Sequence, residues 1–246
     1  MKICLLLSAH FIADFMLQST DMANMKLHNH KLFLKHCLIY SVAITAMVVF
    51  YGSILQIILF ALFISLSHLI IDAIRIREQK RHIYIEKREF RNFLIDQTVH
   101  LIILVIAAFL MPEKNYFGQV VSDLYYTCFT PNLFTVVVIA TAYIACLHPA
   151  GVFIKKIFLR LGFQKFDNAE ENASGFLIGI LERSCILTLA ILGQFTAISF
   201  VIAAKSLARI KLLEEKDFAE KYLVGTLISL FIALISGIIV QRTLGI

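Results

Sequence analysis

The side chains in this sequence best suited to chemistry are histidines and aspartates that occur in pairs, four positions apart. Three such pairs lie in the first half of the chain: His10 and Asp14, His68 and Asp72, and Asp96 and His100. On a helix, this spacing places two side chains on one face, one turn apart, where both can contact one ion. Imidazole and carboxylate ligands together suit Zn, Mn or Fe(II) and argue against a soft-metal site. The pairs therefore predict a site for a divalent metal.

The segments that carry these pairs lie in a strongly apolar chain. Of the 246 residues, 59% are apolar and 16% are charged, whereas soluble domains carry about 25% charged residues. The apolar residues form runs of about 20, the length that crosses a hydrocarbon core of about 30 Å as a helix. Backbone polar groups in lipid must be satisfied within the chain, so these runs should be helices. The sequence predicts an all-α integral membrane protein, embedded in a lipid bilayer with multiple passes.

The apolar runs predict about eight transmembrane helices in two four-helix halves. Their expected ranges are 2–18, 34–51, 53–75, 93–111, 132–158, 175–193, 195–212 and 222–241. Residues 1–111 form the predicted metal-binding half, residues 112–131 an extracytoplasmic connection with room for a short interfacial helix, and residues 132–246 the second half. We expect tight turns at Gly52 and near Gly193.

The distribution of Lys and Arg predicts the orientation. Most of the 23 basic residues lie in four segments, 18–35, 75–92, 155–174 and 205–221. All four segments fall on one side of an eight-helix arrangement. By the positive-inside rule this side is the cytoplasm, so both termini should lie outside, and the membrane would be the cell's inner membrane.

In this orientation the aspartate of each pair lies toward the cytoplasm and its histidine about one turn deeper. His36 opens the second predicted helix at a similar level. Seven candidate ligands from four helices thus share one depth: His10, Asp14, His36, His68, Asp72, Asp96 and His100. We find no Lys or Arg within those helices to neutralise the three carboxylates, and uncompensated buried charge is costly. One ion would use three or four of these ligands, whereas two ions would use six or seven. Gln18 and Gln97 either hold a ligand in place or are ordinary helix-end residues.

The second half contains a different set of polar residues. Arg183, Lys205 and Arg209 could form an anion pocket for a phosphate or lipid head group near the metals. A structural role is an equal alternative. Glu182 and Arg183 could pair with neighbouring helices, and Lys205 and Arg209 could extend to the interface.

Several motifs resemble a family of bacterial inner-membrane proteins of unknown function. They are His10-x-x-x-Asp14-Phe15-x-x-Gln18, His68-x-x-x-Asp72, Asp96-Gln97-x-x-His100, Gly175-x-x-Ile178-Gly179-x-x-Glu182-Arg183, Ala204-Lys205 and Tyr222-x-x-Gly225-Thr226. The resemblance covers nearly the whole chain. More distantly, the histidine–aspartate pattern is similar to membrane-bound metal-dependent hydrolases. The resemblance implies a membrane protein with hydrolase chemistry and supplies no substrate.

These observations favour a membrane-embedded metal-dependent hydrolase that acts at the cytoplasmic interface on an anionic substrate, such as a lipid or a nucleotide. Two alternatives stay open: a transporter or channel for divalent cations or protons, and a sensor or structural protein whose metal only staples the helices. The sequence has no nucleic-acid-binding module, no Walker loop, no G-x-S-x-G elbow and no dinucleotide fingerprint.

Overall fold

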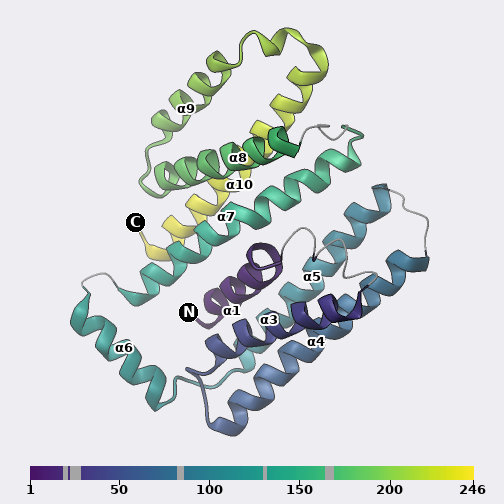
Figure 1. Ribbon diagram of the computed structural model, residues 1–246. Helices are drawn as coiled ribbons and strands as arrows, with labels where there is room; N and C mark the ends of the chain where they lie inside the picture. The colour runs from purple at the N-terminus through teal and green to yellow at the C-terminus, as the bar shows by residue number, and fades with distance from the viewer. Residues whose placement is uncertain (19–21, 23–28, 82–85, 130–131, 164–168) are drawn as a thin grey trace. The chain divides into compact units, whose positions relative to one another are not determined.

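The structure, a computed structural model, describes residues 1–18, 22, 29–81, 86–129, 132–163 and 169–246, and these residues are almost entirely helical. In chain order the elements are α1 (Lys2–Phe11), the π-helical turn η1 (Ile12–Met16), α3 (His30–Val48), α4 (Ile54–Arg81), α5 (Glu86–Leu110), α6 (Tyr116–Cys128), α7 (Leu133–Arg160), α8 (Ala169–Ile191), α9 (Phe195–Ala208), the 3-10 turn η2 (Leu212–Glu214) and α10 (Lys216–Leu244) (Figure 1).

The all-α prediction is confirmed for the described residues. Five helices are long and apolar enough to cross a membrane, namely α3, α4, α5, α7 and α10. The predicted interfacial helix in the connection corresponds to α6, and the predicted turns contain Gly52 and Gly193, which have φ angles of 77° and 70°. Parts of the predicted basic segments, including Lys26 and Lys165, lie outside the described residues, as does Pro131 at the end of the connection.

Several helices extend beyond their apolar runs. α4 continues to Arg81, and α5 begins at Glu86. The added turns are rich in Arg, Lys, Glu and Gln, which are good helix formers in water. Hydropathy therefore locates the apolar part of each helix and misses its polar ends. This difference matters for the site, because Arg75, the last residue of the predicted helix, lies inside α4 and not at its end.

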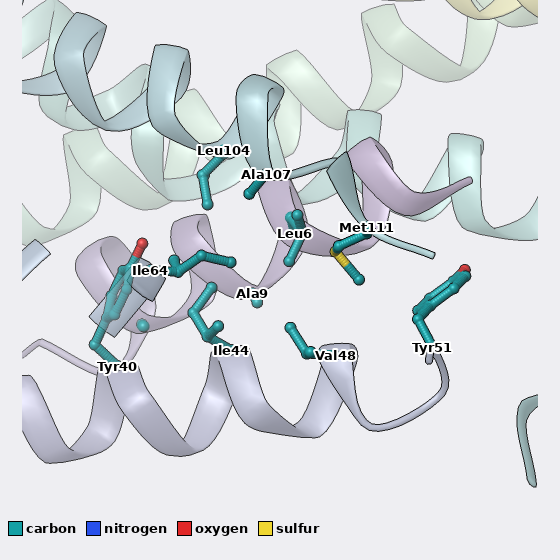
Figure 2. Close-up of a cluster of buried hydrophobic side chains, with 11 residues drawn as sticks. Leu6, Ala9, Tyr40, Ile44, Val48, Tyr51, Ile64, Leu104, Ala107 and Met111 are labelled. Atoms are coloured by element: carbon teal, nitrogen blue, oxygen red, sulfur yellow. The ribbon is translucent and has the colours of Figure 1, made fainter. Parts of the chain in front are cut away.

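The chain divides into two compact units, Met1–Thr141 and Ala142–Ile246. In the first unit, α1 packs against α3 and α5, while α4 packs against α3 and α5. Buried side chains recur on one face of each helix at about one-turn spacing, for example Tyr40, Ile44 and Val48 on α3 (Figure 2). Leu6 of α1 and Leu104 of α5 meet the same hydrophobic cluster.

At one end of the first unit, the turn between α3 and α4 joins the segment before α6. The backbone N–H of Gly52 donates to the carbonyl of Glu113 over 3.0 Å, and the Asn115 side chain donates to the carbonyl of Val49 over 2.8 Å. Tyr51 is only 3% exposed. Burial raises the pKa of Tyr51 to about 12, and the charge of Glu113 adds to the effect.

In the second unit, α8 packs against α10 and α9. Leu187, Ala190, Ile198 and Ala233 belong to its hydrophobic core. α10 approaches α8 closely at Gly237, where an added Cβ would clash with the Cβ of Ala190. A small residue at this position therefore permits the helix contact.

Candidate metal centre

The structure gathers all seven predicted ligands in the first unit. They come from four helical segments: His10 and Asp14 from α1 and η1, His36 from α3, His68 and Asp72 from α4, and Asp96 and His100 from α5. None of these side chains is more than 8% exposed. Buried histidines and carboxylates at this density require compensation by protons, ion pairs or cations.

The helix faces that form the hydrophobic core also position the ligands. His36 lies one turn before Tyr40 on α3, His68 one turn after Ile64 on α4, and His100 one turn before Leu104 on α5. Each helix thus buries apolar side chains along one part of a face and a ligand on the next turn. The packing that buries the core consequently places the ligands together.

A π-helical turn carries Asp14. The N–H of Leu17 bonds to the carbonyl of Ile12 over 2.8 Å, so the ring contains one more residue than an α-helical turn. Such π turns occur frequently at functional sites. One Asp14 oxygen, Oδ1, lies 3.6 Å from Nε2 of both His36 and His68. The turn therefore holds this carboxylate between two imidazoles from other helices.

Four ligand atoms lie close to one another in the first unit. They are Asp14 Oδ1, His36 Nε2, His68 Nε2 and Asp72 Oδ2. His36 Nε2 lies 3.2 Å from His68 Nε2 and 3.4 Å from Asp72 Oδ2, while His68 Nε2 lies 4.0 Å from Asp72 Oδ2. A tetrahedral zinc site with bonds of 2.0–2.1 Å has ligand atoms about 3.3 Å apart. The ligand atoms of His36, His68 and Asp72, at 3.2–4.0 Å from one another, are close to the spacing around one divalent ion.

The remaining candidate ligands form overlapping groups with these residues. Ligand atoms of Asp72, Asp96 and His100 lie within 4.8 Å of one another, as do those of His10, Asp14 and His68. Asp72 and His68 each also belong to the group that includes His36. A carboxylate has two oxygens, so Asp72 can serve two neighbouring ions at once.

The protonation of His100 follows from its hydrogen bond. Its Nδ1 lies 2.9 Å from the backbone carbonyl of Asp96, and because a carbonyl only accepts, Nδ1 must donate. In the neutral ring Nε2 then carries a lone pair. This buried nitrogen has no hydrogen-bond partner among the described residues, and neither does Asp96 Oδ1. Two orphaned buried acceptors in one group fit a cation, because leaving them unsatisfied is costly.

Three neighbours of the ligands complete the site. Arg75 Nη1 donates to Asp96 Oδ2 over 2.8 Å, which corrects the expectation that no cation within these helices neutralises the carboxylates. The spacing of Asp72 and Arg75 by three on one helix is the signal in the sequence that could have indicated this neighbour. Gln97 contacts His10 Nε2 at 3.3 Å and donates to Asp96 over 3.0 Å, so it contacts two ligands. The ring of Tyr40 stacks on that of His68, with centroids 3.6 Å apart.

Two of the three residues of the predicted anion pocket, Arg183 and Lys205, have protein partners. Arg183 is 2% exposed and donates to the carbonyls of Cys146 and Leu147 on α7. Lys205 pairs with Glu182 at 2.6 Å and donates to Thr226 over 3.0 Å. Arg209 ends α9 as its C-cap. The observed partner of Glu182 is thus Lys205, and the anion pocket of Arg183, Lys205 and Arg209 stays a prediction.

The fold and the site together define a class: an all-helical chain with several membrane-length helices and a buried cluster of histidines and aspartates. The chain belongs to the family described as "Protein of unknown function (DUF3307)", whose match covers residues 3–128. This match contains all seven candidate ligands and Arg75. The predicted membership of an uncharacterised family is thereby confirmed over residues 3–128, whereas the resemblance of the motifs beyond residue 128 and the similarity to hydrolases stay predictions. No curated protein and no solved structure matches the chain.

Proposed function

We propose that this protein is a membrane-embedded metal-dependent hydrolase that acts on an anionic substrate at the cytoplasmic interface. The observation that supports this function best is the surplus of ligands. A single structural ion needs four ligands, whereas seven buried candidates lie here in overlapping groups. A site with more ligands than a staple needs is better explained by two ions that carry out chemistry.

The two parts of the site suit different roles. Asp14, His36, His68 and Asp72 offer enough ligands to enclose one ion. Asp72, Asp96 and His100 offer three ligands, the number typical of catalytic ions that keep a position for water or substrate. A divalent ion there would lower the pKa of a bound water to about 7 and polarise an ester oxygen.

Packing of the same helices favours hydrolysis over transport. Beyond the ligands, α1, α3, α4 and α5 bury a hydrophobic cluster that includes Leu6, Ile44, Ile64 and Leu104 (Figure 2). An ion path would require polar groups along those faces. The apolar packing supports a site that is reached from one side of the membrane.

We further infer that eight helices cross the inner membrane and that both termini lie outside. Lys31, Lys35, Arg75 and Arg77 occur at the ligand end of α3 and α4. Basic residues mark the cytoplasmic side. This orientation would open the site to a cytoplasmic substrate or to the head groups of the inner leaflet.

The direct test is elemental analysis of the purified full-length protein in detergent. We expect one or two equivalents of Zn, Mn or Fe per chain, with hydrolysis of chromogenic phosphate or carboxylate esters that a chelator abolishes and the metal restores. His100→Gln distinguishes a catalytic ion from a structural one, because His100 belongs to the three-ligand group and a catalytic ion there predicts a folded, inactive variant. Purified protein without stoichiometric metal would sink the proposal.

A further inference from the structure

We propose that Arg75 is the residue that binds the anionic group of the substrate, and that this group is a phosphate dianion. The inference rests on the proposed function and specifies its substrate class. It arises from the position of Arg75 between the buried ligands and the exposed surface and from the charge balance of the site.

Arg75 spans the boundary of the site. Its side chain is 21% exposed, whereas that of its partner Asp96 is 3% exposed. One nitrogen, Nη1, donates to Asp96 Oδ2 over 2.8 Å. A guanidinium carries five N–H donors in a planar fork. The Asp96 contact therefore holds the group at the edge of the cluster while further donors remain for an outside acceptor.

The charges of the site require an anion once two ions are bound. Asp14, Asp72 and Asp96 contribute three negative charges, because metal ligation keeps carboxylates ionised. Arg75 contributes one positive charge, and two divalent ions contribute four. The filled centre would carry two excess positive charges in a buried setting, where uncompensated charge is costly. A phosphate monoester dianion supplies the matching charge.

The chemistry of the donors selects the same group. Arginine binds phosphate through two parallel hydrogen bonds, and this geometry adds specificity to the electrostatic attraction. An ion at Asp72, Asp96 and His100 would lie next to the carboxylate that Arg75 holds. Arg75 and the ion can thus contact different oxygens of one phosphate. Neutral esters and amides would leave both positive charges uncompensated.

The test uses inorganic phosphate as the probe and the purified full-length protein loaded with Mn or Zn. Phosphate affinity is measured by titration calorimetry, and metal content is measured on the same samples. We expect Arg75→Gln to weaken phosphate binding at least about tenfold, the loss typical of one charged hydrogen bond. Arg77→Gln is the matched control. Arg77 is exposed on the same helix, and its substitution removes the same charge. It should leave phosphate affinity unchanged.

Each outcome decides the matter. Wild-type phosphate affinity in a metal-loaded Arg75→Gln variant would overturn the role of Arg75. Equal affinity for phosphate and for acetate, which carries one charge, would overturn the dianion. If Arg75→Gln does not fold, Arg75→Lys decides instead. Lys keeps the charge without the fork, so we expect intermediate affinity, and full affinity would contradict the proposal. Absence of metal from the wild type would instead count against the proposed function itself.

Discussion

Asp72 belongs to two of the three overlapping groups of ligand atoms and lies one turn from His68 on α4. Its two oxygens allow it to serve both parts of the site, so a change here should affect every bound ion. The carboxylate is 3% exposed. Its burial is hard to explain by stability, since buried charge is costly without a cation.

The first prediction follows from this position. Asp72→Asn keeps the shape of the side chain and removes its charge, so we expect metal content to fall to half or less while the protein stays folded. Elemental analysis and size-exclusion chromatography in detergent measure the two quantities. Asp123→Asn on α6 is the control, because this aspartate is exposed. An Asp72→Asn variant with full metal occupancy would remove Asp72 from the ligand set.

The ligands can be predicted from the sequence, and so can one neighbour, Gln97, whereas the roles of Arg75 and Tyr40 depend on contacts between helices. A spacing of four between histidine and aspartate is a property of helix geometry, so the sequence alone predicts the pairs and their common face. Hydropathy places Arg75 where a loop begins, because it ends a helix where charges appear, and this hides its role beside Asp96. The stacking of Tyr40 on His68 depends on contacts between α3 and α4, which the spacing of residues does not specify.

At the scale of elements, glycines and apolar runs in the sequence indicate the turns and helices. Local irregularities of a helix, such as a π turn, leave no signal in the sequence. Gly52 predicts a turn, since a positive φ favours glycine. The π turn at Ile12–Met16 has no counterpart in the sequence pattern. Its residues, Ile12 to Met16, continue the apolar helix without Gly or Pro.

The second prediction concerns the joined turns that contain Tyr51. The hydroxyl of Tyr51 is buried and has no hydrogen-bond partner among the described residues, a situation that costs about 1–3 kcal/mol. Tyr51→Phe should therefore keep the free energy of unfolding at pH 8 or raise it by about 1 kcal/mol. Thermal unfolding in detergent measures the change. Tyr116→Phe, at an 82% exposed position, is the control and should have no effect.

The pH dependence of the same variant gives a further readout. The folded pKa of Tyr51, about 12, lies above the unfolded value of 10.0. Between these values the folded state binds more protons than the unfolded state, so stability falls as pH rises from about 10 to about 12. Tyr51→Phe should lose less stability over this interval than the wild type. Identical alkaline profiles would show that Tyr51 does not contribute.

At the scale of the whole molecule, the family match and the compact units divide the chain in similar ways. The match ends at residue 128, and the first unit ends at Thr141. The candidate metal centre therefore lies within the matched part. The second unit contains two basic side chains with hydrogen-bond or ion-pair partners, Arg183 and Lys205. Their hydrogen bonds depend on carbonyls and carboxylates of neighbouring helices, which a linear sequence does not specify.

The number of membrane crossings depends on whether α8 and α9 both span the bilayer. α9 has 14 residues, or about 21 Å at 1.5 Å per residue, and a hydrocarbon core is about 30 Å thick. A hairpin of α8 and α9 that enters and leaves on one side would leave the location of Ile246 unchanged. Reporters near Arg81 and after Ile246 would give the same readings in both arrangements, so these two reporters do not distinguish them.

The third prediction resolves this ambiguity with a reporter in the turn between α8 and α9. If eight helices cross, a reporter inserted at Gly193 should read as periplasmic, one near Arg81 as cytoplasmic and one after Ile246 as periplasmic. Gly193 lies in an exposed turn with φ 70°, so an insertion there disturbs little packing.

A cytoplasmic reading at Gly193 would show that α8 and α9 do not cross. A cytoplasmic reading after Ile246 would show that the chain crosses the membrane an even number of times between Arg81 and Ile246, and not an odd number. A periplasmic reading near Arg81 would move the metal centre to the other side of the membrane and exclude a cytoplasmic substrate, because Arg75 lies on the same helix end as Arg81.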